Sequence, residues 1–215
     1  MVTISRVYTR TGDAGRTRLS NLSETDKTDP RVEAYGDVDE ANSHLGVALA
    51  YGLEPELQEV LEHLQNELFD LGADLSTPLV EHPAHEPLRI VADSVQRLEG
   101  WCDEFSEDLP VLRSFVLPGG TPAAAALHVA RTVTRRAERR AWAAVAVYGT
   151  DPAPADGSAP GGLNPLALTY LNRLSDLLFV LARRLAVPDG ETLWVPGSGR
   201  GRRPEAADSG TDVAG

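Results

Sequence analysis

The sequence predicts an all-α fold, a single bundle of five helices, and three observations support this expectation. Leucine, valine and alanine recur in alternating steps of four and three along five stretches of the chain, as in helices packed nearly parallel or antiparallel. Three of the stretches begin with a capping residue followed by proline. Only 6% of the 215 residues are aromatic, so aliphatic side chains must form the core. Five such helices with modest connections form a bundle.

The helices are expected in the following order, each given by its first and last periodic apolar residue: 32–49, 57–75, 91–105, 127–148 and 167–185. The pairs Asp29-Pro30, Thr121-Pro122 and Asn164-Pro165 are expected to open the first, fourth and fifth helices. No stretch alternates convincingly between apolar and polar residues, so no β-strand is predicted.

The helices divide the chain into three regions. Residues 1–29 are polar and loop-like, residues 30–195 form the bundle, and residues 196–215 are glycine-rich, polar and expected to be disordered. Inside the bundle, the Pro/Gly/Ala stretch 151–162 cannot continue a helix and is expected to be a loop.

The composition excludes several classes of protein. There is one cysteine, Cys102, so no internal disulfide can form, and its helical apolar surroundings predict a buried core residue. No secretory signal and no apolar run of about 20 residues is present, which predicts a cytoplasmic protein without a membrane partner. A formal net charge of -12 argues against general nucleic-acid binding, so a bound anion needs a local basic site.

One such basic site lies in the fourth predicted helix, where five arginines fall within ten residues. Arg131, Arg135 and Glu138 are spaced by four and three and therefore share a face, while Arg136, Arg139 and Arg140 add further positive charge. Three explanations remain open at this point. The arginines bind a polyanionic ligand, they pair with nearby Asp and Glu, or they form a solvated basic face.

The N-terminal segment YTRTGDAGRT, residues 8–17, has the composition of a phosphate-binding loop. Its glycines let backbone N–H groups approach a phosphate, its hydroxyls and arginines are donors, and Asp13 is suited to magnesium. The segment is not a Walker A loop, and a plain turn explains its glycines equally well.

Acidic and amide side chains elsewhere are candidates for pairing. One of Asp37, Asp39 and Glu40 in the first helix is expected to pair with an arginine of the fourth. Asn172 and Asp176 lie one turn apart on the apolar fifth helix, and they need either an interhelical hydrogen bond or a ligand. The five histidines are scattered, and none completes the Glu-x-x-His pair of di-iron bundles.

Taken in order, these motifs resemble the PduO-type ATP:cob(I)alamin adenosyltransferases. The resemblance extends from Tyr8 to about Trp194, and the motifs that carry it are YTRTGDAGRT, Lys27, VEAYGDVDEANSHLG, SFVLPGG, RTVTRRAER and YLNRLSDLLF. It implies a five-helix homotrimer with active sites between subunits. It also implies transfer of the 5'-deoxyadenosyl group of ATP to the cobalt of reduced cobalamin, giving coenzyme B12 and triphosphate. A reductase and a B12-dependent enzyme are the possible partners.

The resemblance also implies roles for individual residues. The ATP site would be formed by Thr9, Arg10, Thr11, Gly12, Thr17, Arg18, Lys27, Arg135, Arg136, Ala137, Glu138, Arg139 and Asn172. Magnesium would be held mainly by the phosphates of ATP. Asp39 and Arg131 match an intersubunit salt bridge, and Phe115 matches the aromatic residue that displaces the lower axial ligand of cobalamin. The chain departs mildly from the pattern, with Ala41 where leucine is frequent and Arg10 where lysine is frequent.

Two other classes of function are compatible with parts of this pattern. A nucleotide-sensing bundle without chemistry would keep the triphosphate residues but give no reason for Phe115. A structural helical oligomer would use the arginines for salt bridges and leave the N-terminal segment unexplained.

Overall fold

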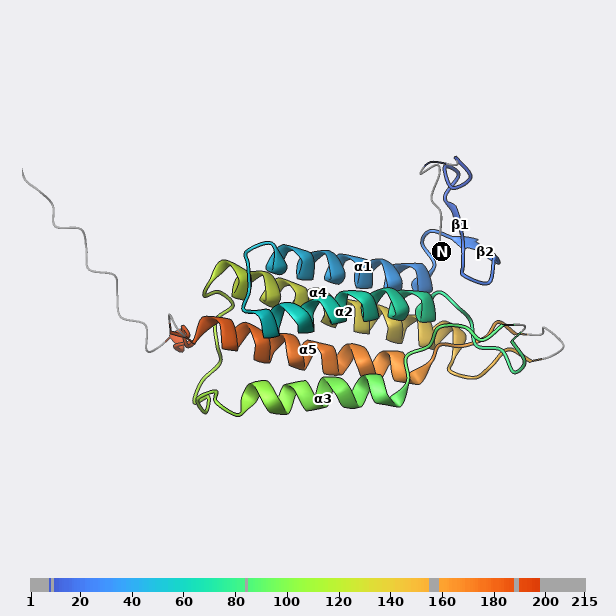
Figure 1. Cartoon of the computed structure of the whole chain (residues 1–215). Coiled ribbons are helices and arrows are strands. Elements are labelled where there is room, and N and C mark those ends of the chain that lie inside the picture. Colours follow the sequence, from blue (N-terminus) through green and yellow to red (C-terminus); the bar gives the residue numbers. More distant parts are fainter. Residues whose placement is uncertain (1–7, 9, 84, 155–158, 188–189, 198–215) are drawn as a thin grey trace, which may run out of the picture.

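The computed structural model describes residues 8, 10–83, 85–154, 159–187 and 190–197. This part of the chain contains five helices: α1 (Pro30–Leu49), α2 (Pro55–Leu75), α3 (Ala92–Ser106), α4 (Pro122–Tyr148) and α5 (Pro165–Ala186). They lie side by side, and each runs opposite to the one before it (Figure 1). The predicted all-α fold with five helices is therefore confirmed. No helix within the described ranges is long and apolar enough to cross a membrane.

The three predicted helix starts are confirmed by their capping geometry. The side chains of Asp29, Thr121 and Asn164 each accept a hydrogen bond from a backbone N–H two or three residues later, at 2.8, 3.2 and 3.1 Å. In each case a proline occupies the first turn, where its missing N–H costs no hydrogen bond.

Small side chains bring α1 and α4 close together, and these two helices have the most extensive contact in the bundle. Ala130, Ala137 and Ala141 of α4 are fully buried, as are Ala34 and Ala48 of α1. The leucines of α2 and α5 fill the rest of the core, with little aromatic contribution. Because α4 is fixed so closely against α1, the direction in which each of its arginines points is also fixed.

The prediction that the chain has no strand is wrong for the N-terminal segment. Two short strands, β1 (Arg16–Arg18) and β2 (Glu24–Asp26), form an antiparallel hairpin. Its cross-strand partners are charged or hydroxyl residues, among them Arg16 opposite Asp26 and Arg18 opposite Glu24. A search for apolar alternation cannot detect such a hairpin, because neither of its faces is apolar.

The loop after α4 is held against the end of α2 by a close backbone approach. A Cβ atom added to Gly161 would lie 1.8 Å from the carbonyl oxygen of Leu79, so no other residue fits there. The fully buried Arg31 donates a 2.9 Å hydrogen bond to the carbonyl oxygen of Gly161. Residues 155–158 of this predicted loop, and residues 198–215 of the predicted tail, lie outside the described residues.

Candidate functional site

A cleft of about 780 Å³ opens beside the first half of α4 and the second half of α5. We call it the α4/α5 cleft. Its walls are Arg131 and Arg135 of α4, Ser175, Asp176 and Phe179 of α5, the segment 112–116, and Trp194. Two of the four phenylalanines and one of the three tryptophans of the chain line this cleft. It therefore combines aromatic walls with cationic side chains, because Arg113 of the segment 112–116 adds a third arginine to the two of α4.

The two α4 arginines of the cleft, Arg131 and Arg135, lack an acidic partner among the described residues. The Nε atom of Arg131 is buried and has no hydrogen-bond partner there, and its guanidinium carbon lies 6.0 Å from the centre of the Phe179 ring. Burial, together with the charge of Arg135, lowers the pKa of Arg131. A cation held in this way is stabilised by an anion, and the one carboxylate that lines the cleft, Asp176, accepts its hydrogen bond from Arg173 instead.

Phe115 extends into the same cleft from the segment that connects α3 to α4. Its side chain is 78% exposed, which is unusual for a phenylalanine, and its ring meets the Trp194 ring edge-on at 6.1 Å between centroids. Two residues far apart in the sequence and predicted to be functional, Phe115 and Arg131, therefore share one cleft.

Beyond the cleft, polar side chains continue along the sides of α4 and α5 that face each other. Glu138 accepts a 3.2 Å hydrogen bond from Nδ2 of Asn172, so the structure contains the interhelical hydrogen bond, one of the two alternatives left open for this asparagine. At about 1.5 Å per residue, Arg131, Arg135 and Glu138 span roughly 10 Å. The helices thus present a strip of polar side chains of suitable length for an extended ligand such as a nucleotide. A contact of Asn172 with such a ligand stays a prediction.

The other arginines of α4 point elsewhere. The Nε atom of Arg136 donates to Asp37 at 3.1 Å, and its guanidinium also contacts Glu40. Arg140 pairs with Glu33 at 3.4 Å. The expectation that acids of the first helix pair with arginines of the fourth is therefore confirmed, through Asp37 and Glu40 among the three candidates. The hydrogen bond that Arg136 donates to Asp37, together with the charges of Asp37 and Glu40, raises the pKa of Arg136.

Two further predicted residues have local roles. The side chain of Ala137 is fully buried in the core, where it packs, so it is not available to a ligand. Arg139 is exposed, and its Nη1 atom donates to the carbonyl oxygen of Arg135 at 2.9 Å.

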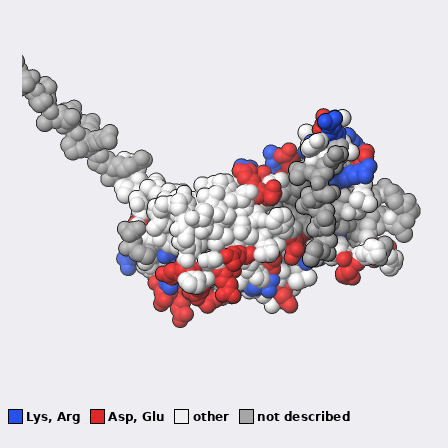
Figure 2. All heavy atoms as spheres, turned by 45° about the horizontal axis from the view of Figure 1, so that its top comes forward, with Lys and Arg blue, Asp and Glu red and all other residues white. Residues whose placement is uncertain are grey.

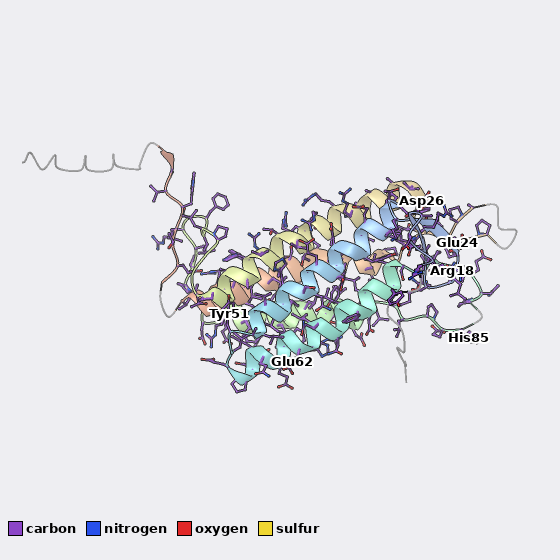
Figure 3. All side chains as sticks on the ribbon, turned by 90° about the horizontal axis from the view of Figure 1, so that it is seen from above. Arg18, Glu24, Asp26, Tyr51, Glu62 and His85 are labelled. Atoms are coloured by element: carbon purple, nitrogen blue, oxygen red, sulfur yellow. The ribbon has the colours of Figure 1, made fainter. Side chains whose placement is uncertain are left out.

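The predicted phosphate-binding segment lies beside the start of α1, at the end of the bundle away from the α4/α5 cleft. Figure 3 shows Arg18, Glu24 and Asp26 together at this end, while Tyr51, just after α1, lies at the other. Within one chain, the segment and Phe115 are thus far apart. Thr9 lies outside the described residues.

The N-terminal segment brings several of its predicted residues together. A Cβ atom on Gly12 would lie 3.3 Å from Nζ of Lys27, so the glycine permits the lysine to approach the loop. Arg10 adopts a left-handed backbone conformation with φ of 62°, which is typical of a tight turn. The turn begins at the next residue, Thr11. Thr17 hydrogen-bonds to Tyr35, and Arg18 pairs loosely with Glu24 at 3.4 Å.

A second cleft of about 510 Å³ lies between α1 and α2 and contains Asp39, which we call the α1/α2 cleft. Arg18, Tyr35, Asn42 and Phe69 also line it. Asp39 is exposed and has no ion pair within the described ranges. Asp39 and Arg131 therefore line separate clefts of one chain, and no salt bridge joins them within the described part of a single subunit.

Sequence reasoning did not assign two aromatic residues of the α4/α5 cleft. Phe179 ends the motif YLNRLSDLLF among core leucines, and its position in the helical period does not distinguish a cleft wall from a core residue. Trp194 follows the last helix, where no periodicity applies. The signal that the sequence offers for both is their residue type, because aromatic residues are rare in this chain.

The described part of the chain offers no protein-built metal centre. No three His, Cys, Asp or Glu side chains in it gather closely enough to hold a metal ion. A magnesium ion at this site would therefore depend on ligand oxygens.

A comparison with known proteins matches a family model, described as cobalamin adenosyltransferase, to residues 7–185. The corrinoid adenosyltransferase of Mycobacterium tuberculosis is 56% identical over 200 residues, covering 93% of this chain and 97% of that protein. The corrinoid adenosyltransferase of Bacillus subtilis is 40% identical, covering 83% and 85%.

A solved structure has the same fold. A variant of the PduO-type ATP:corrinoid adenosyltransferase from Lactobacillus reuteri, complexed with cobalamin and ATP, superposes with a TM-score of 0.73 at 35% identity. The match covers 88% of this chain and 99% of that chain. With the family model matching most of its length, the chain belongs to the cobalamin adenosyltransferase family.

Proposed function

We infer that this protein is a corrinoid adenosyltransferase, which transfers the 5'-deoxyadenosyl group of ATP to the cobalt of cob(I)alamin and releases triphosphate. Family membership and relatives that bear this name support the inference. The structural observation that carries it is the α4/α5 cleft, in which the exposed ring of Phe115 lies near two arginines without an acidic partner.

The chemistry requires little from the protein's own functional groups. Cob(I)alamin is itself the nucleophile: its electron pair forms the Co–C5' bond while the bond from C5' to the triphosphate oxygen breaks. No side-chain nucleophile is needed, and the single cysteine is a poor one, because burial and the neighbouring Asp176 raise the pKa of Cys102 to about 11. The protein must stabilise the leaving triphosphate and align C5' with cobalt.

Arg135, Glu138 and Asn172 are proposed to bind ATP along the strip between α4 and α5, with Arg135 nearest the developing charge. The N-terminal residues are proposed to surround the triphosphate: Thr9, Arg10, Thr11, Gly12, Thr17, Arg18 and Lys27. Magnesium would be carried by the phosphates of ATP and would neutralise part of their charge.

These two groups of residues lie far apart in one chain, and this supports a site built between subunits. A head-to-tail contact could place the unpartnered Arg131 against Asp39 of the partner subunit, and three such contacts close a ring. Figure 2 shows a broad face free of charged residues between the basic hairpin and a strongly acidic edge. Exposed apolar side chains on α1 and α4, such as Val47 and Trp142, add to the argument for a homotrimer.

Phe115 is proposed to act on the corrinoid rather than on ATP. An apolar ring on the lower face of cobalamin excludes both the lower ligand and water, and four-coordinate cobalt(II) is easier to reduce to cobalt(I). The reaction also requires a reductase that supplies cobalt(I), and a B12-dependent enzyme is the natural consumer of the product. We place the protein in the cytoplasm, without a nucleic-acid partner, in agreement with its charge of -12.

The decisive test is an anaerobic absorbance time course with chemically reduced cobalamin, ATP and magnesium. Loss of the cobalt(I) band with growth of adenosylcobalamin is the expected result. A thermal-shift titration with ATP and magnesium separates the alternatives. ATP binding without any corrinoid change would indicate a nucleotide-sensing bundle, and no ATP binding would indicate a structural oligomer.

A further inference from the structure

A buried ion pair joins the end of α5 to the segment that follows it. Arg183, in the last turn of α5, contacts Glu191 through two hydrogen bonds, Nε to Oε1 at 2.7 Å and Nη2 to Oε2 at 3.1 Å. The two side chains are only 9% and 8% exposed. A bidentate pair of this kind fixes both distance and orientation.

The same arginine reaches a third part of the chain. Its Nη2 atom also donates to the carbonyl oxygen of Pro110 at 2.7 Å, in the segment that leads to Phe115. Arg183 therefore connects α5 with both segments that form the outer wall of the α4/α5 cleft.

Beyond this junction the two segments pair with each other like a short antiparallel ribbon. The backbone N–H of Leu117 donates to Thr192 at 2.8 Å, and that of Trp194 donates to Phe115 at 2.7 Å. Ser114 adds a 2.7 Å hydrogen bond from its hydroxyl to the carbonyl oxygen of Trp194. Both segments lie at the left end of the bundle in Figure 1.

These contacts determine how Phe115 is held. Because its side chain is 78% exposed, core packing cannot fix the direction of its ring. The restraints present are the backbone hydrogen bond to Trp194 and the edge contact with the Trp194 ring. Trp194 in turn belongs to the segment 191–195, which is attached to α5 by the buried ion pair between Glu191 and Arg183.

We propose that Arg183 and Glu191 are positioning residues for Phe115: their buried ion pair holds the segment 191–195 in place, and this segment aligns the Phe115 ring with the corrinoid face. The inference rests on the role proposed above for Phe115. It assigns the alignment to residues that line neither cleft, and it predicts that charge at Glu191 controls a step on the cobalt.

The test uses the full-length protein and measures four-coordinate cob(II)alamin, from its absorbance and electron paramagnetic resonance spectra, in the presence of saturating ATP under anaerobic conditions. Glu191→Gln keeps the shape of the side chain but removes its charge. We expect it to reduce the four-coordinate fraction by roughly tenfold, since small misplacements of an aligned group cost up to about 100-fold. Arg183→Lys retains the positive charge of the ion pair. We expect this variant to lose less of the four-coordinate fraction than Glu191→Gln does.

Three further variants make the experiment decisive. Arg184→Gln, next in the sequence and in a loose, exposed contact with Asp108 at 3.9 Å, is the matched control and should behave as the wild type. Ser114→Ala removes one hydrogen bond of the ribbon without leaving a buried charge, so it tests whether the segment 191–195 aligns Phe115 even if Glu191→Gln folds poorly. In a Phe115→Ala background, Glu191→Gln should have no additional effect.

Other outcomes have distinct meanings. If Phe115→Ala abolishes the four-coordinate species while Glu191→Gln and Ser114→Ala leave it unchanged, the positioning role is wrong and the proposed function stands. If Phe115→Ala itself leaves the species unchanged, the role of Phe115 is wrong, and the positioning role fails with it. ATP affinity should remain within about twofold of wild type in every variant, because none of them touches the polar strip. A parallel loss of ATP affinity and melting temperature would indicate a purely structural ion pair.

Discussion

The Nε atom of Arg136 donates to Oδ2 of Asp37 at 3.1 Å, so this arginine is committed to α1 while its neighbour Arg135 faces the α4/α5 cleft. Adjacent residues on a helix point about 100° apart, and a row of arginines is therefore divided between two faces. The explanation by acidic partners applies to Arg136 and Arg140. Of the other arginines, Arg131 and Arg135 line the cleft and are left to a ligand or a partner subunit.

Substitution of these two neighbours should separate binding from stability. Arg135→Gln should raise KM for ATP by about 10- to 100-fold, which corresponds to loss of one charge-assisted hydrogen bond of about 1.5–3 kcal/mol, with little change in melting temperature. Arg136→Gln should lower the free energy of unfolding by at most about 1 kcal/mol, because its ion pairs are partly exposed. Steady-state kinetics and urea unfolding of both variants measure the contrast. A larger rise in KM for Arg136→Gln would reverse the assignment.

Phe115→Ala should slow adenosylation that begins from cob(II)alamin by about tenfold or more. This is the order of magnitude expected when the alignment of a reacting group is lost. Affinity for ATP should stay largely intact, because the ring makes no polar contact. Supplying cob(I)alamin already reduced should recover part of the rate. A collapse of ATP affinity would instead mean that Phe115 lies at the nucleotide.

If Arg131 and Asp39 meet across a subunit contact, Arg131→Ala and Asp39→Ala should each weaken the oligomer and reduce turnover. For Arg131→Ala the loss of turnover should be on the order of 100-fold. The double variant should be little worse than either single one, since both remove the same interaction. Sedimentation analysis at several protein concentrations, beside rate measurements, tests this. Additive losses, or turnover unchanged in Arg131→Ala, would refute the shared salt bridge.

The helices could be predicted because their signals are local. The spacing of Leu57, Leu64 and Leu71, and the caps at Asp29 and Asn164, lie within one or two turns of the features they specify. The hairpin was missed because its strands carry polar side chains on both faces. Which sequence motifs line the α4/α5 cleft depends on helix packing, which spacing alone does not determine.

The candidate site was predicted only in part for the same reason. Residue identity and order indicated Arg131, Arg135 and Phe115, and the structure places these three in one cleft. Sequence spacing could not reveal that Arg136 is paired with α1, since that depends on the rotation of α4 about its axis. Nor could it indicate Trp194, whose position depends on the long-range contact between Arg183 and Glu191.

Cys102 gives a prediction about reactivity. It was expected to be a buried core residue and is half-buried, at the edge of the core. Burial, followed by the charge of Asp176, raises its pKa from 9.0 to about 11, so the thiolate fraction at pH 8 falls by about 100-fold. Alkylation by iodoacetamide at pH 8 should therefore be at least about 100-fold slower in the native protein than in urea. Equal rates in both states would contradict the raised pKa.

His128 gives a prediction about stability and pH. It is 3% exposed, its Nδ1 has no hydrogen-bond partner in the described structure, and its ring lies 6.3 Å from that of Phe179. Burial first, and then the charge of Arg131, lower its pKa below 6.5, although Glu191 acts in the opposite direction. The folded protein therefore favours the neutral ring, while the unfolded chain takes up a proton as the pH falls below 6.5.

The contribution of His128 to stability is accordingly complete above pH 6.5 and is lost as the pH falls from there through the lowered pKa of the folded state. His128→Leu should flatten the dependence of the free energy of unfolding on pH in this window, by at most about 1.4 kcal/mol per pH unit. Urea unfolding of both proteins at intervals from pH 5 to pH 8 measures this, with His44→Gln as a control on a more exposed ring. Parallel curves for wild type and His128→Leu would mean that His128 has the same pKa in the folded and unfolded states, with the attraction of Glu191 offsetting burial and the charge of Arg131.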